Sequence, residues 1–119
     1  MTRDPKNDVF ARLSDRTKFV ALGLWSAFFC RTGEVCLTGD VSGDRRSDVI
    51  AFNHGLDGTN AVFIGLSNGA GFGPATKAHD FFCTKSQTCA VGDVTGDNKA
   101  DLIAFTRGAN PRVFVGISQ

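Results

Sequence analysis

Two stretches of the chain are nearly the same, and their similarity decides the fold. Residues 28–52 read FFCRTGEVCLTGDVSGDRRSDVIAF, and residues 81–105 read FFCTKSQTCAVGDVTGDNKADLIAF, with no gap between them. The constant offset of 53 residues places every cysteine of the first stretch on a cysteine and every aspartate on an aspartate. A repeat of this length is typical of proteins built by stacking copies of one supersecondary unit.

The repeat extends beyond this motif in both directions. Residues 9–14 (VFARLS) fall on residues 62–67 (VFIGLS) at the same offset, and residues 113–118 (VFVGIS) form a third copy after a two-residue deletion. The 119 residues therefore hold just over two repeats, which we treat as a single domain. We divide the chain into a partial repeat at 8–35, a full repeat at 36–88 and a partial repeat at 89–119.

Each repeat is predicted to contain four short strands. Alternating apolar residues indicate the strands, and clusters of Gly, Asn and Asp indicate the turns between them. In the full repeat the expected strands are residues 35–38, 48–53, 61–67 and 78–83. Four strands in a repeat of about 40 to 50 residues are the signature of a β-propeller blade. We therefore predict an all-β protein with blades of four antiparallel strands and about two blades per chain.

A piece of two blades leaves sheet faces exposed that a closed propeller buries between its blades. VFARLS and VFVGIS also represent the same strand, so two complete blades would have one copy in excess. Either the chain is a piece of a longer propeller, or several copies assemble into a ring. We expect assembly, which makes a further copy of the chain its principal partner.

Charge and hydropathy exclude several classes of function. The net charge is +1 and the signs are interspersed, so there is no basic surface for nucleic acid. The longest apolar stretch, residues 19–30, is interrupted and falls short of the roughly 20 residues that span a membrane, so membrane insertion is not expected. No nucleophile, base and acid form a recognisable motif, so we predict that the chain is not an enzyme.

Two aspartate-rich loops predict calcium sites. Residues 40–48 (DVSGDRRSD) and 93–101 (DVTGDNKAD) place side-chain oxygens at the first, third, fifth and ninth positions of a loop that enters a strand. Calcium takes roughly six to eight oxygen ligands, and alternate positions of a tight turn point inward. We expect two ions per chain. The side-chain ligands are Asp40, Ser42, Asp44 and Asp48 in the first loop and Asp93, Thr95, Asp97 and Asp101 in the second, joined by the backbone carbonyls of Arg46 and Lys99.

A turn without metal is the alternative for both loops, because aspartates also accept backbone N–H bonds in tight turns. We favour metal because three carboxylates within nine residues repel one another unless a cation lies between them, and the pattern occurs twice. Magnesium demands stricter octahedral geometry and is the less suitable ion. The expected role of the calcium is structural.

The segments GDVSGDRRSDVIAF and GDVTGDNKADLIAF resemble the FG-GAP or VCBS type of calcium-binding propeller repeat. Such repeats occur in integrin α-chain heads, in secreted bacterial proteins and in a group of fungal lectins, and the resemblance covers nearly the whole chain. The family usually has glycine at the sixth position of the loop, where this chain has Arg45 and Asn98. Asparagine adopts a left-handed conformation more readily than arginine, so we expect stronger calcium binding in the second loop.

The four cysteines lie in two segments of identical spacing, CRTGEVC and CTKSQTC. Because repeats should pair alike, we predict the disulfides Cys30–Cys36 and Cys83–Cys89. Zinc is disfavoured by the spacing and by the lack of nearby histidines, whereas free buried thiols in a cytosolic protein remain an alternative. Disulfides indicate an oxidising compartment, so we expect a secreted, extracellular protein.

Two hypotheses for the function follow. The first is lectin-like binding of carbohydrate between blades, as in some members of the resembled family. The second is a structural, self-assembling or protein-binding module without sugar binding. For the first, Trp25 is a candidate stacking platform, although packing is the simpler explanation for it. Further candidate contacts lie in the loops after the second strand of each repeat: Asn53, His54, Asp57 and Arg107.

Overall fold

The computed structural model describes residues 9–14, 19–26, 29–108 and 111–118. These residues form an all-β protein, as predicted, with nine strands and one turn of 3-10 helix, η1 (Leu56–Gly58). Within them, no helix has the length and apolar character needed to cross a membrane. The strands are β1 (Val9–Ser14), β2 (Phe19–Ser26), β3 (Val35–Gly39), β4 (Asp48–Phe52), β5 (Val62–Gly65), β6 (Thr76–His79), β7 (Thr88–Gly92), β8 (Asp101–Phe105) and β9 (Val113–Gly116).

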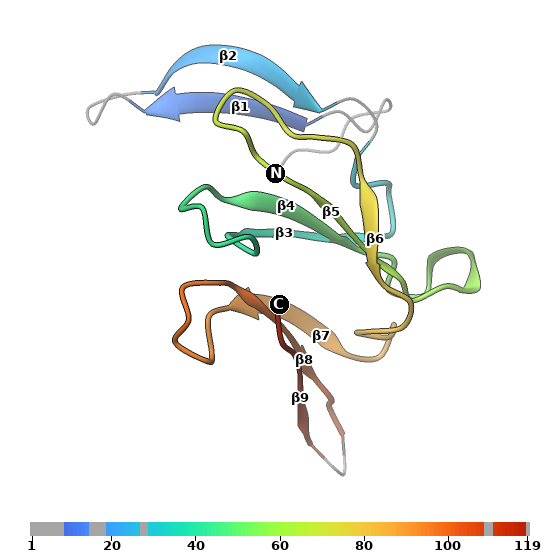
Figure 1. The fold of residues 1–119 in the computed structure, drawn as a ribbon. Helices are drawn as coiled ribbons and strands as arrows, with labels where there is room; N and C mark the ends of the chain where they lie inside the picture. Colours follow the sequence, from blue (N-terminus) through green and yellow to red (C-terminus); the bar gives the residue numbers. More distant parts are fainter. Residues whose placement is uncertain (1–8, 15–18, 27–28, 109–110, 119) are drawn as a thin grey trace.

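The strands form three antiparallel sheets in chain order. The first sheet is β1–β2, the second is β3–β4–β5–β6, and the third is β7–β8–β9. Figure 1 shows the first and third sheets on opposite sides of the second. Each strand in a sheet follows its neighbour directly in sequence, so every sheet is a simple meander.

The strand register repeats with the sequence. Val35 lies opposite Phe52, and 53 residues later Thr88 lies opposite Phe105. Phe52 in turn faces Val62, whereas Phe105 faces Val113 at an offset of 51. The two-residue deletion therefore falls in the loop between β8 and β9. The third sheet repeats the first three strands of the second.

The first sheet corresponds to the last two strands of the second. Val9 lies opposite Ser26 as Val62 lies opposite His79, and a register shift follows Val9 and Val62 alike. The three copies of the VFxxxS motif thus occupy the position of β5 in three different sheets, as β1, β5 and β9. This arrangement accounts for the copy that two complete sheets would have in excess.

The fourth strand of the full repeat differs from the sequence-based expectation. It was expected at residues 78–83 but is Thr76–His79, because β5 is short and its pairing ends where Val62 faces His79. Beyond this point the backbone N–H of Phe82 donates to the carbonyl of Asn60, and Cys83 has a φ of 57°. The second half of the expected strand is therefore the connection to β7.

The main core lies between the second and third sheets. Ile50, Phe52 and Val62 have no exposed surface and pack in one cluster with Cys83, Cys89 and Ala104. A smaller cluster forms around Phe29, Val49 and Ala51. Since successive residues of a strand point to opposite faces, β4 is buried on both of its faces.

Gly39 lets the second and third sheets approach each other. A Cβ at this position would lie 2.5 Å from Val91 Cγ1 and 3.1 Å from Ala100 Cβ. We expect Gly39→Ala to lower the free energy of unfolding by about 1–3 kcal/mol, because the sheets must move apart.

The equivalent Gly92→Ala is the matched control. Its Cβ would meet only Ile103 Cδ1, at 3.8 Å, and neither glycine has a positive φ. Urea unfolding of both variants in dilute solution checks this prediction. Equal losses of stability would contradict it.

Candidate functional site

The two aspartate loops connect the first and second strands of the second and third sheets, and their backbones are held in the same way. The Asp40 carboxylate accepts hydrogen bonds from the N–H groups of Gly43 and Arg45, both at 2.7 Å. Asp93 accepts the equivalent bonds from Gly96 and Asn98, at 2.8 and 2.9 Å. The first carboxylate thus closes each loop into a tight turn.

The sixth position of each loop is left-handed. Arg45 has a φ of 69° and Asn98 a φ of 67°, the conformation for which glycine is the usual residue. Asparagine visits this region more readily than arginine does. The backbone at the sixth position is therefore more strained in the first loop, at Arg45, than in the second loop, at Asn98.

The ninth-position aspartates tie each loop to its sheet. Asp48 and Asp101 have no exposed surface. Asp48 accepts backbone N–H bonds from Val41 at 3.0 Å and from Ser67, just beyond β5, at 2.8 Å. Asp101 accepts the equivalent two bonds at 3.0 and 2.9 Å. The bonds from Ser67 and Ser118 come from residues distant in sequence, so they hold each loop in a defined place on its sheet.

The carboxylates converge in the second loop. Asp93, Asp97 and Asp101 each offer an oxygen, and the three oxygens lie within 4.8 Å of one another. Among the described residues, the three aspartates of the first loop form no group of this kind. There Asp44 instead has the Arg46 guanidinium 3.6 Å away, which offsets its charge. The second loop is the better fit to a cation.

The remaining predicted ligands lie beside these carboxylates. The Ser42 hydroxyl is 3.4 Å from Asp40, and the Thr95 hydroxyl is 3.4 Å from Asp101. At the seventh position the backbone N–H groups donate to the fifth-position carboxylates, from Arg46 to Asp44 at 2.9 Å and from Lys99 to Asp97 at 3.0 Å.

Hydrogen bonds lower the pKa of the first carboxylate of each loop. Desolvation raises the pKa of Asp93, but backbone N–H donors outweigh this effect and the pKa is lowered overall. The pKa of Asp40 is lowered in the same way, against desolvation, by backbone N–H groups and the Ser42 hydroxyl. Both groups are therefore anionic at neutral pH, as a ligand for a hard cation must be.

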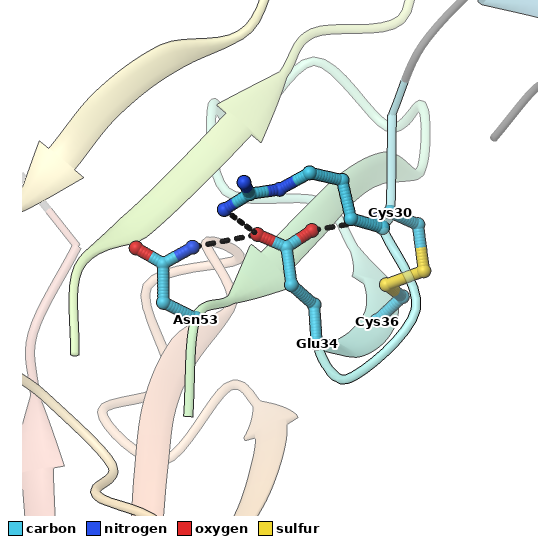
Figure 2. Close-up of a disulfide and its surroundings, with 5 residues drawn as sticks. Cys30, Glu34, Cys36 and Asn53 are labelled. Carbon is cyan, nitrogen blue, oxygen red and sulfur yellow. Dashed lines mark hydrogen bonds and ion pairs between the residues drawn. A yellow bond between two sulfur atoms is a disulfide. The ribbon is translucent and has the colours of Figure 1, made fainter. Parts of the chain in front are cut away.

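Both predicted disulfides are present, Cys30–Cys36 and Cys83–Cys89. Figure 2 shows that the first disulfide closes the turn containing Glu34. The Glu34 carboxylate, 5% exposed, accepts bonds from the backbone N–H of Arg31 at 2.7 Å and from Asn53 Nδ2 at 2.6 Å. Disulfides such as these two are typical of proteins that fold in an oxidising environment.

The candidate sugar contacts do not meet in one place among the described side chains. Asn53 is 2% exposed and is hydrogen-bonded to Glu34 and to the Thr59 hydroxyl. Its side chain is therefore part of the buried interior and not a surface contact for a ligand. His54 Nε2 lies 2.7 Å from the carbonyl of Gln87, which links the second sheet to the second disulfide loop. Arg107 is exposed in the loop after β8. Trp25 lies in β2 and Asp57 in η1, and both side chains are outside the described residues.

A groove that the sequence analysis missed lies between the second and third sheets, with a volume of about 570 Å³. Ile64, Leu102 and Ile117 provide apolar lining, and His79 and Ser118 provide polar groups. The lining residues come from five separate segments of the chain, and no sequence motif connects them. The remaining lining residues are Val41, Ala78, Ala100 and Gly116.

No protein-family model, curated protein or solved structure matches this chain. Its function is therefore argued from its own residues and geometry.

Proposed function

We propose that the chain is a secreted, calcium-stabilised module of the β-propeller type that binds carbohydrate between its second and third sheets. The observation that carries the proposal is the groove between these sheets. Ligand sites are usually concave, with mostly apolar walls and a few polar groups that fix orientation. A sugar ring presents both an apolar C–H face and hydroxyl groups, so it suits walls formed by Ile64, Leu102 and Ile117 beside the imidazole of His79.

Calcium is proposed to stabilise the loops that border this groove. Asp93, Asp97 and Asp101 would hold the ion in the second loop, with the Thr95 hydroxyl, and Asp40, Asp44 and Asp48 would hold a weaker second ion. The bound ion would supply positive charge that cancels the repulsion between the carboxylates. Val41 and Ala100, which line the groove, belong to the two loops. The Ala100 N–H donates to the carbonyl of Asp40, so the loops support each other.

Calcium titration followed by thermal unfolding tests this role. We expect stabilisation by about 2.7 kcal/mol when free calcium is about 100 times its Kd, and loss of this gain in chelator. Asp97→Ala should remove most of the gain, because it removes one of the three converging carboxylates. Asp44→Ala, the equivalent change in the first loop, should remove less. If the thermal stability of the wild-type chain is the same with calcium and with chelator, the proposal is contradicted.

Binding to immobilised glycans by the oxidised, calcium-loaded chain tests the carbohydrate site. His79→Ala and Ile117→Ser should weaken the binding of any glycan that the wild type retains. Leu66→Ser is the matched control, since Leu66 is equivalent to Ile117 and half-exposed but lies outside the groove. Agglutination that N-acetylglucosamine abolishes would also support the proposal. Absence of glycan binding by folded wild type would refute it.

A further inference from the structure

The third sheet has one covered face and one open face. Its inner face, formed by Cys89, Val91, Leu102 and Ala104, packs against the second sheet. Its outer face is formed by Thr88, Ala90, Ile103, Phe105, Val113 and Val115. The register places these residues together, since Ala90 pairs with Ile103, Ile103 with Val115, and Phe105 with Val113.

The outer face is apolar except for Thr88, and three of its large side chains are exposed. Phe105 is 40% exposed, Val113 58% and Val115 44%. The only charged residue in β7, β8 and β9 is Asp101, which is buried. A contiguous apolar surface without charge is uncommon on a protein that remains a monomer and marks a site of association.

The same face of the second sheet shows what covers such a surface. The residues equivalent to Ile103, Phe105 and Val113 are Ile50, Phe52 and Val62, and none of these three has exposed surface. They are covered by the inner face of the third sheet, which belongs to the next repeat along the chain. The chain thus contains one complete example of the interface that its third sheet leaves open.

Gly92 provides a second, independent observation. It is equivalent to Gly39, where the absence of a Cβ is required by the approach of Val91 from the next sheet. Among the residues that the structure describes Gly92 has no such neighbour, since a Cβ there would meet only Ile103 Cδ1 at an ordinary 3.8 Å. Its φ is not positive either, so backbone conformation does not require glycine. If another sheet packed on the outer face, a Cβ at this position would clash with it, and glycine would be required as it is at Gly39.

We propose that the outer face of the third sheet binds a second copy of this chain, which continues the stack of sheets. The internal interface between the second and third sheets shows that a sheet of this repeat packs on such a face. This inference does not depend on sugar binding.

Sedimentation velocity and native mass spectrometry of the oxidised, calcium-loaded chain, without any glycan, test the proposal. We expect a discrete oligomer that dissociates on dilution. Val113→Lys should raise the dissociation constant by roughly tenfold or more, because it places a charge in the interface. Gly92→Ala should also weaken association. Leu66→Lys is the control, because Leu66 is 50% exposed but lies outside the outer face.

Thermal unfolding verifies that each variant is folded, which we expect because Val113 is exposed in the single chain. Three results would overturn the proposal. They are a wild-type chain that stays monomeric at high concentration, association without a defined stoichiometry, and a Val113→Lys variant that associates as well as Leu66→Lys does.

Discussion

Replacement of Phe52 by alanine is expected to lower the free energy of unfolding by about 3–5 kcal/mol. Phe52 has no exposed surface and lies in the cluster that joins the second and third sheets. Its truncation removes buried apolar contacts and leaves a cavity that the surrounding strands fill only in part. Urea denaturation monitored by circular dichroism would measure the loss. A large effect is expected because the small domain has one main core.

The matched control for this variant is Phe105→Ala, at the equivalent position of the third sheet. Phe105 is 40% exposed in the single chain, so its truncation should cost about 1 kcal/mol or less. The comparison is made in dilute solution, where association does not cover the outer face. If both variants lose the same stability under these conditions, the core does not lie where the structure places it.

Asp48→Ala is expected to cost about 2–6 kcal/mol even in the presence of a calcium chelator. The Asp48 carboxylate is buried and accepts backbone bonds from Val41 and Ser67, so its removal leaves two N–H groups without their acceptor. Each buried donor that loses its partner costs about 1–3 kcal/mol. Thermal unfolding in chelator would separate this structural role from any role in metal binding.

Two further variants refine this test. Asp48→Asn keeps one carbonyl oxygen and should lose about half as much stability as Asp48→Ala. Asp44→Ala alters an exposed loop carboxylate and should change stability by about 0.5 kcal/mol or less in chelator. If Asp44→Ala is as costly as Asp48→Ala, the buried hydrogen bonds are not what stabilises the loop.

Much of the local structure could be predicted because it depends on residues close in sequence. Cys30 and Cys36 are close enough to pair within one turn, and the spacing repeats at Cys83 and Cys89. The aspartate loops were located by their spacing alone. The left-handed position occupied by Arg45 was expected to be strained, and its φ of 69° lies in the region disfavoured for arginine.

Other features could not be predicted because they depend on neighbours distant in sequence. The pairing of β5 decides where β6 ends, so the fourth strand was placed too far along the chain. Asn53 was a candidate ligand contact, but its buried bond to Glu34 spans 19 residues and assigns it to the interior. The groove between the sheets combines segments that no motif connects.

The sequence by itself determined that the chain repeats, that the repeats form β-strands, and which cysteines pair, since each depends on local patterns that occur twice. Only the tertiary structure decided which copy of each residue is buried. DVIAF and DLIAF are nearly identical strands with equivalent registers, yet Phe52 is fully buried and Phe105 is 40% exposed. The physical reason is that burial depends on the sheet that packs against a strand, and the second sheet has the third sheet on that face, whereas no described sheet packs on the same face of the third.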